Sequence, residues 1–240
     1  MTNTDGHVRD AGHSATALYE VVVVAYRSRR PLTQLLASLP ADIPLTLVDN
    51  SADQDPVRDL LEGRSAGTYI DAGGNVGFAA AANLGARTST RPYVIFVNPD
   101  CTPTLDALDQ LVDYLERHPR CASAAPALMD RRSKPQIGAA GWQPTLRRAL
   151  VHAIGLHLWW PHKGIWGRAR PGEVLEVGWL PGTCLTVRQE AFLQVGGFDE
   201  RYFLYSEDMA LGARLQACGH TQVLRGDLRV THTGGGSSEV

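Results

Sequence analysis

The chain alternates short apolar runs with amphipathic segments across its first 120 residues, and this alternation limits the folds open to it. The run YEVVVVA at 19–25 is β-branched and almost wholly apolar, which is typical of a strand covered on both faces. We expect strands at 19–25, 45–49, 68–71 and 93–97, and helices at 31–39, 56–63, 78–86 and 104–118. The pattern predicts an α/β fold with a mostly parallel central sheet, helices on both faces, and ligands bound at the carboxyl ends of the strands.

The second half of the chain is less regular, although no linker divides it. Residues 129–178 hold four of the five tryptophans, many basic residues and no clear period, and such segments are usually functional or mobile. After it we expect a strand at 179–187, helices at 189–195 and 207–218, and short strands near Val223 and Val230. The sequence predicts a disordered tail at 1–17 and a single domain at 18–240, with 129–178 as an irregular acceptor or lid segment.

Composition narrows the partners and the location. The formal net charge of −2 gives no basis for nucleic-acid binding. The four cysteines lack metal-type spacing, which favours free thiols in a reducing compartment. The polar start lacks a signal-peptide core, and no window approaches the ~20 apolar residues that span a bilayer. We expect a cytoplasmic protein with no transmembrane segment and at most peripheral contact with the inner face of the plasma membrane.

Two features near strand ends suit a metal. Asn98-Pro99-Asp100 follows the buried strand at 93–97, where the ligand edge of the sheet is expected. Divalent cations that bind phosphates take one or two such carboxylates, although these residue types are also common in plain turns. His232, after the last expected strand, offers a nitrogen ligand, but a lone histidine near a chain end is more often incidental.

An acidic pair lies at the start of the last expected helix. Ser206 suits the N-cap position, which places Glu207 and Asp208 in the first helical turn. The buried stripe predicted by Leu211 and Leu215 puts Asp208 on the inward side. A carboxylate there can act as a general base toward a hydroxyl; the alternative is the ordinary acidic start of a helix.

A glycine-rich turn, Gly73-Gly74-Asn75-Val76-Gly77, joins an expected strand to an expected helix. Backbone N–H groups at such a helix start suit a diphosphate. The spacing nearly matches a dinucleotide fingerprint, but the turn follows the third strand and alanine replaces the first glycine. A tight turn with close helix packing explains the pattern equally well.

Seven segments, taken in order from Tyr19 to Ser238, resemble glycosyltransferase family 2, in particular its rhamnosyl- and galactofuranosyltransferases. They are VVVVAYRS, LVDNS, GGNVGFAAAANLG, VIFVNPDC, WLPGTCLTVRQEAF, VGGFDERYFLYSEDMALGARL and THTGGGSS. The resemblance implies a GT-A fold and an inverting, metal-dependent transfer of a sugar from a nucleotide-sugar donor. One departure is Ala210, where the family often has a further acidic residue.

The resemblance also implies roles for individual residues. It implies that Asp208 is the catalytic base supported by Glu207, and that Asp100 and His232 hold a divalent metal, Mg²⁺ or Mn²⁺. Trp179 and Gly182 are implied to shape the donor and acceptor pocket. The residues implied to bind the nucleotide or donor are Ala25, Tyr26, Asp49, Asn75, Gly77, Asn83, Asn98 and Asp100.

The resemblance also implies the donor and the acceptor. It favours dTDP-L-rhamnose as donor, with UDP-linked galactofuranose or N-acetylhexosamine as alternatives. The implied acceptor is a glycan or lipid-linked glycan of bacterial surface polysaccharide synthesis, and a homodimer is left open. Trp159 and Trp160 suggest an acceptor-binding surface, because aromatic faces stack on sugar rings; an ordinary hydrophobic flap is the alternative.

The turn after the first expected strand argues against two other classes of enzyme. A nicotinamide dehydrogenase or a sugar nucleotidyltransferase needs glycines directly after the first strand, and the turn AYRSRRP there has none. A non-catalytic protein that binds nucleotide sugars or carbohydrates stays open.

Overall fold

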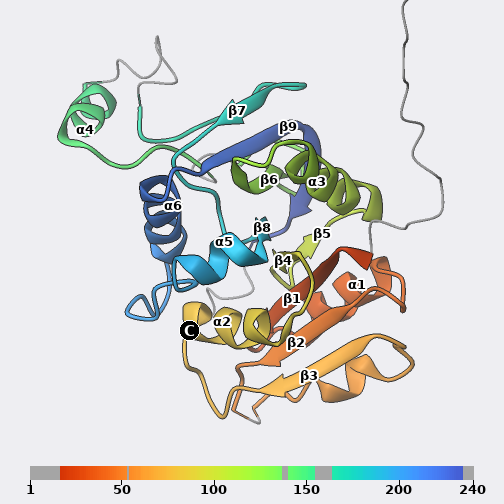
Figure 1. Ribbon diagram of the computed structural model, residues 1–240. Coiled ribbons are helices and arrows are strands. Elements are labelled where there is room, and N and C mark those ends of the chain that lie inside the picture. The colour runs from red at the N-terminus through yellow and green to blue at the C-terminus, as the bar shows by residue number, and fades with distance from the viewer. Residues whose placement is uncertain (1–16, 53, 137–139, 155–163, 235–240) are drawn as a thin grey trace, which may run out of the picture.

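One mixed sheet organises the computed structural model, which describes residues 17–52, 54–136, 140–154 and 164–234 (Figure 1). Within these residues the strand order is β3-β2-β1-β4-β8-β6-β9-β5, and β7 pairs with β9. The strands are β1 (Tyr19–Ala25), β2 (Leu45–Asp49), β3 (Gly67–Asp71), β4 (Tyr93–Val97), β5 (Cys101–Thr102), β6 (Cys121–Met129), β7 (Val174–Glu176), β8 (Cys184–Arg188) and β9 (Thr221–His232).

Most of the sheet is parallel, as the alternating sequence predicted. β1 pairs in parallel with β2 and β4, β2 with β3, and β6 with β9. β8 is antiparallel to both β4 and β6, so the strands on its two sides run in the same direction. The carboxyl ends of β1, β2 and β3 are aligned, since Ala25 is opposite Asp49 and Asp49 is opposite Asp71. The predicted α/β class is therefore confirmed.

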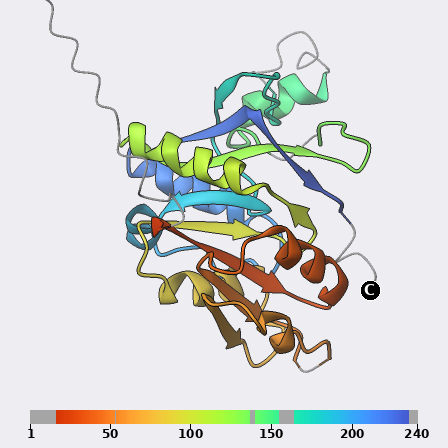
Figure 2. The same cartoon turned by 90° about the vertical axis from the view of Figure 1, so that its right-hand side faces the viewer.

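Helices cover both faces of this sheet and divide the core in two. α1 (Arg29–Ser38) and α3 (Leu105–Arg117) pack on one face, which Figure 2 shows from the front. α2 (Phe78–Thr88), α5 (Gln189–Gln194) and α6 (Glu207–Ala217) pack on the other. Alternate side chains of β4 enter the two cores: Ile95 faces the first, and Phe96 the second. This two-sided burial is the reason for the continuous apolar run in the sequence.

Several elements differ from the sequence prediction: β5, β7 and α4 were not expected, and the strand expected at 179–187 begins only at Cys184, as β8. β6 was missed because its sequence, CASAAPALM, is rich in alanine and contains Pro126, both poor strand signals; a register shift after Pro126 accommodates the ring. The helix expected at 56–63 is a short 3₁₀ helix, Arg58–Leu61. The two strands expected near Val223 and Val230 form the single strand β9.

The described part of 129–178 contains regular structure as well as loops. A hairpin turn brings Met129 opposite Pro135, α4 (Leu146–Ala153) follows, and β7 adds to the edge of β9. In Figure 1, α4 stands away from the body of the protein, at the outer end of this segment. None of the helices in the described residues is long and apolar enough to cross a bilayer.

Candidate active site

The carboxyl ends of β1 and β2 form one corner of the candidate site. The backbone N–H of Asn50 donates to the carbonyl of Ala25 at 2.8 Å and so joins the two strand ends. Tyr26, the next residue, is half-buried beneath the Arg27 guanidinium, which lies 5.4 Å from its ring centroid. Ala25, Tyr26 and Asp49 therefore lie together, as expected of residues proposed to hold one ligand group.

Asp49 is held by its own neighbours. Its side chain is only 4 % exposed, and its two oxygens accept from the backbone N–H of Ser51 and from the Tyr69 hydroxyl, each at 3.0 Å. Burial, together with the Asp49 bond, raises the pKa of Tyr69 to about 12, so the phenol stays a donor at neutral pH. These contacts fix the carboxylate of Asp49 while leaving it further lone pairs to accept from a ligand.

The glycine-rich turn is tied to β2 through Asn50. The Asn50 side chain donates to Asn75 Oδ1 at 3.1 Å and accepts from the Val76 N–H at 2.9 Å. Gly77 has φ +85°, and a Cβ there would lie 2.6 Å from the Phe203 carbonyl oxygen. Gly77 therefore permits both the turn and the close approach of the loop before α6, which places Asn75 and Gly77 at the ligand edge.

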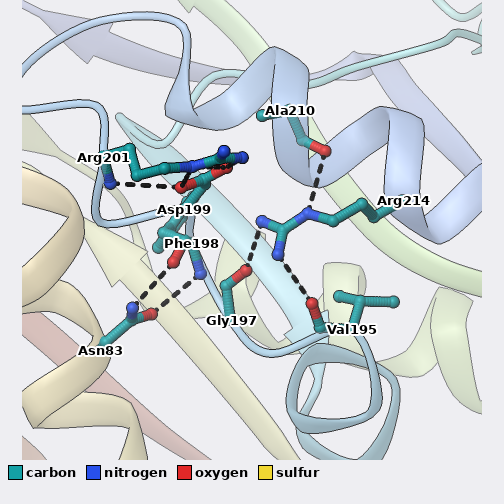
Figure 3. A network of polar contacts seen from close by, with 8 residues as sticks. All are labelled: Asn83, Val195, Gly197, Phe198, Asp199, Arg201, Ala210 and Arg214. Atoms are coloured by element: carbon teal, nitrogen blue, oxygen red, sulfur yellow. Dashed lines mark hydrogen bonds and ion pairs between the residues drawn. The ribbon is translucent and has the colours of Figure 1, made fainter.

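Asn83, implied by the resemblance to lie near the donor, is a buried residue of α2. It is 1 % exposed on α2, and its amide bonds both the N–H and the carbonyl of Phe198 at 2.9 Å (Figure 3). Its Nδ2 also donates to Glu200 at 2.9 Å. These bonds tie α2 to the loop before α6, and a donor contact for Asn83 stays a prediction.

Arg214 holds the same loop from the other side. Its guanidinium donates to the carbonyls of Val195 and Gly197, both at 2.7 Å, and to that of Ala210 (Figure 3). The loop between α5 and α6 is thus clamped by α2 and α6 together. This clamp fixes where α6 begins, and α6 carries the acidic pair.

Asp100 and His232 meet at the junction of β5 and β9. Asp100 Oδ2 lies 3.4 Å from His232 Nε2. Gln136 donates its Nε2 to the His232 carbonyl at 2.8 Å, and its Oε1 lies 2.9 Å from His232 Nδ1. Because Oε1 is an acceptor, Nδ1 carries a proton, and Nε2 is the ring atom that faces Asp100. Burial tends to raise the pKa of Asp100, but contacts with His232 and the backbone outweigh it and hold that pKa below the ordinary value.

Cys101 lies close enough to join a metal cluster with Asp100 and His232. Burial raises the pKa of its thiol far above the ordinary value, and the thiol donates to the Thr183 carbonyl at 3.5 Å. The same carbonyl accepts from the backbone N–H of Asn98, which is half-buried beside it. A carboxylate and an imidazole are therefore the members of the group that could hold a metal, and both suit Mg²⁺ or Mn²⁺.

A pocket of about 410 Å³ is lined by one member of each pair, His232 and Asp208. The chain thus brings together residues that are 24 positions apart in sequence. The other lining residues are Leu128, Gln136, Trp166, Trp179, Pro181, Thr183, Tyr205, Ser206 and Met209. One pocket thus offers a carboxylate, an imidazole and three aromatic walls.

Asp208 is in the first turn of α6, as predicted, but Ser206 does not cap the helix. Ser206 and Tyr205 have φ angles of 71° and 67°, and the Ser206 side chain makes no capping bond. Asp208 accepts from the Met209 N–H at 2.7 Å instead. Burial raises the pKa of Asp208 and raises that of Glu207 to about 7. Two successive left-handed residues are costly in a loop, and such strain is common beside functional groups.

Glu207 predicts a pH-dependent stability. Its side chain is buried and its Oε2 has no hydrogen-bond partner in the described structure. Since the folded-state pKa is about 7 against an ordinary 4.5, stability present below pH 4.5 is lost as the pH rises to about 7. Glu207→Gln is therefore expected to recover on the order of 2–3 kcal/mol of unfolding free energy at pH 8, and little at pH 4.5.

Urea unfolding at both pH values measures this effect. Glu190→Gln is the matched control, since Glu190 is in the first turn of α5 and exposed. An equal change for the two variants at pH 8 would contradict a buried, ionised Glu207.

Trp179 lines the pocket, and Gly182 lies between Pro181 and Thr183, which also line it. Trp179 is 4 % exposed, and its indole N–H has no partner among the described residues. Its ring packs edge-on against Trp166, with centroids 5.8 Å apart. A Cβ on Gly182 would lie 3.0 Å from the Phe78 ring, so glycine is what lets this turn before β8 approach α2. Trp159 and Trp160 lie outside the described residues, and their acceptor role stays a prediction.

Sequence reasoning missed several supporting residues. Asn50, Tyr69 and Gln136 each hold a predicted site residue in place. Asn50 lies inside the LVDNS segment that carried the resemblance, which was a usable signal. Gln136 is 96 positions from His232 and gave none. Trp166 is one of the four tryptophans of 129–178, and nothing local to it indicates that it lines a pocket with Asp208.

The sheet with its ligand edge, the glycine-rich turn and the pocket lined by both Asp208 and His232 are features expected of a glycosyltransferase of the GT-A fold. The profile of the family described as glycosyl transferase family 2 matches residues 20–170. The chain belongs to that family.

Relatives agree with this assignment. The chain is 34 % identical to the N-acetylglucosaminyl-diphospho-decaprenol L-rhamnosyltransferase of Mycobacterium tuberculosis, over 90 % of this chain and 76 % of that protein. It is 25 % identical to the rhamnosyltransferase WbbL of Escherichia coli, over 83 % and 77 % of the two chains. The fold matches that of a mannosyltransferase from Pyrobaculum calidifontis, solved with GDP-Man and Mn²⁺, with a TM-score of 0.64 at 16 % identity. That match covers 92 % of this chain and spans 58 % of the other.

Proposed function

We propose that this glycosyltransferase moves L-rhamnose from dTDP-L-rhamnose to a hydroxyl of a lipid-linked glycan, with inversion and with a divalent metal. The observation that carries the proposal is one pocket lined by both Asp208 and His232, with Asp100 beside His232. The mycobacterial relative is named for a rhamnosyl transfer to a diphospho-decaprenol acceptor, and WbbL is also named a rhamnosyltransferase. UDP-linked galactofuranose or N-acetylhexosamine is the alternative donor, and a homodimer remains a prediction.

Asp208 is the base in this proposal. Burial raises its pKa, so the carboxylate has a stronger affinity for a proton than an exposed aspartate. It takes the proton of the acceptor hydroxyl as that oxygen bonds to the anomeric carbon, and the bond from that carbon to the diphosphate breaks. The hydroxyl attacks from the face opposite the leaving diphosphate, so a single displacement inverts the anomeric centre. Glu207, the buried residue before Asp208 in the chain, supports the position of the base in this proposal.

Asp100 and His232 are the residues that would hold the metal. Asp100 Oδ2 and His232 Nε2 lie 3.4 Å apart, and the contact of Gln136 with His232 Nδ1 fixes the imidazole with Nε2 turned toward Asp100. This donor set fits Mg²⁺ or Mn²⁺ with its other positions left to phosphate and water. When bound, the metal supplies Lewis-acid stabilisation of charge on the leaving diphosphate.

The other residues at the ligand edge of the sheet and in the pocket are assigned here to the donor or to the acceptor. We assign the base and ribose to Ala25, Tyr26 and Asp49, and the diphosphate to the turn at Asn75 and Gly77 beside Asn98. The aromatic walls of the pocket, Trp166, Trp179 and Tyr205, suit the apolar faces of sugar rings. The orphan indole N–H of Trp179 is a donor available to a sugar hydroxyl.

Calorimetric binding of dTDP, UDP and GDP, each with and without Mn²⁺, tests the donor. We expect dTDP to bind most tightly and only with Mn²⁺. A preference for UDP would keep the enzyme class and replace the rhamnosyl donor. Release of dTDP from dTDP-L-rhamnose upon addition of a prenyl-diphospho-N-acetylglucosamine acceptor tests turnover, and binding without any release would favour a non-catalytic protein.

A further inference from the structure

Helix α4 carries its leucines on the outside. Leu146 is 89 % exposed, and Leu150 and Ile154 are each 59 % exposed. Ile154 directly follows the last residue of α4, and its N–H still donates to the Leu150 carbonyl at 3.1 Å, so the spacing of four residues puts all three along one side. Single exposed apolar residues are ordinary on protein surfaces, but three large ones in a row on one helix mark a surface that meets something apolar.

The opposite side of α4 is polar and faces the protein. Arg148 donates to the Gly164 carbonyl at 2.8 Å, and its guanidinium lies 4.8 Å from the Trp142 ring centroid. A helix of a globular protein normally turns its apolar side inward and its charges outward. α4 does the reverse, so packing against the described residues does not account for the exposed leucine stripe of Leu146, Leu150 and Ile154.

The sequence segment that contains α4 has basic residues and no acidic ones. From Arg131 to Gly172 the sequence has eight lysines and arginines and no aspartate or glutamate, although the whole chain has a net charge of −2. Arg147 is exposed and flanks the leucine stripe. An apolar stripe bordered by arginine, within a segment free of acids, complements a surface that is apolar inside and anionic outside, which describes a bilayer with acidic lipids.

The two ends of the α4 segment lie against the wall of the pocket. Gly141 bridges to both Trp166 and Trp179, which line the pocket, and the Trp142 N–H donates to the Ile165 carbonyl at 2.9 Å. α4 projects from this wall, away from the sheet (Figure 1). A surface that α4 touched would therefore lie at the side of the pocket where Trp166 and Asp208 are found.

We propose that α4 is an interfacial helix whose Leu146, Leu150 and Ile154 enter an anionic lipid bilayer, with Arg147 at the headgroups. This placement holds the pocket beside the membrane, where the reacting sugar of a lipid-linked acceptor lies. The benefit to acceptor use rests on the proposed function, whereas the membrane contact itself does not. Vesicle binding measured without donor or acceptor therefore separates failure of this inference from failure of the proposed reaction.

Co-sedimentation with phosphatidylcholine vesicles, with and without phosphatidylglycerol, tests the contact on the full chain. We expect binding that requires phosphatidylglycerol, and a drop of roughly tenfold or more in the partition coefficient for Leu146→Ser/Leu150→Ser. Arg147→Glu should weaken binding to the anionic vesicles. The matched controls are Leu193→Ser, at an exposed leucine on α5, and Arg120→Glu, at another exposed arginine; both should bind like the wild type.

Three results would overturn the proposal. One is a wild type that ignores anionic vesicles. Another is a double-serine variant that binds as well as Leu193→Ser. The third is a wild-type dimer that the double-serine variant converts to monomer without any vesicle binding, which makes a second copy the occupant. Light scattering and melting temperatures of the same variants distinguish these results from simple misfolding; a melting loss confined to the double variant, without vesicle binding, means that the chain itself covers α4.

Discussion

Asp208→Asn is expected to lower kcat by ~10²–10⁴-fold, because it removes the proton acceptor for the attacking hydroxyl while keeping the shape of the side chain. Donor affinity should change little, since the donor contacts proposed here lie at β1, β2 and the glycine-rich turn. Steady-state kinetics with dTDP-L-rhamnose, together with calorimetric binding of dTDP and Mn²⁺, separates the two quantities. Asparagine can still accept the Met209 N–H that Asp208 accepts now, so the start of α6 should persist.

Asp106→Asn is the matched control for this variant. Asp106 is also an aspartate in the first turn of a helix, α3, but it is exposed on the other face of the sheet. Its loss should leave kcat within about twofold of the wild type, as for most surface substitutions. If Asp208→Asn keeps more than about a tenth of the wild-type kcat, Asp208 is not the base, and buried Glu207 becomes the next residue to test.

The sequence was sufficient for the fold because the fold depends on local patterns. Four apolar runs and the helices between them are enough to specify a parallel sheet, and the polar residues that end the strands follow from its geometry. β6 was not predicted because it is a central strand made mostly of small residues. Most of its alanines are buried between β8 and β9, although alanine has a low propensity for strands.

The site was harder to predict because its parts meet through long-range contacts. Asp100 and His232 were proposed from resemblance, and only the pairing of β5 with β9 brings them together. Asn83 makes another long-range contact. It lies in the segment that most resembles the family, and its buried amide on α2 bonds the loop before α6, a contact that no sequence pattern predicts. Local sequence identifies residue types at an edge, but tertiary packing decides which of them face the ligand.

Asp100→Ala is expected to abolish the Mn²⁺-dependent part of dTDP binding, weakening it by at least ~10²-fold in the presence of metal. Asp100 supplies the only carboxylate of the metal group in the described structure, and its depressed pKa keeps that charge in place at neutral pH. Calorimetric titration of dTDP at several Mn²⁺ concentrations measures the loss. His232→Ala should weaken binding less, because it removes a neutral ligand and no charge.

Cys101→Ala is the control for Asp100→Ala and His232→Ala, because Cys101 is the third member of the possible metal-binding group. Its thiol is buried, its pKa is raised, and its sulfur is directed to the Thr183 carbonyl, so it should contribute nothing to the metal. We expect the Mn²⁺ dependence of Cys101→Ala to equal that of the wild type. A loss in Cys101→Ala with retention in Asp100→Ala would reverse the ligand assignment. Retention in both would mean that the metal is held by the diphosphate alone, so that Asp100 and His232 shape the pocket without binding a cation.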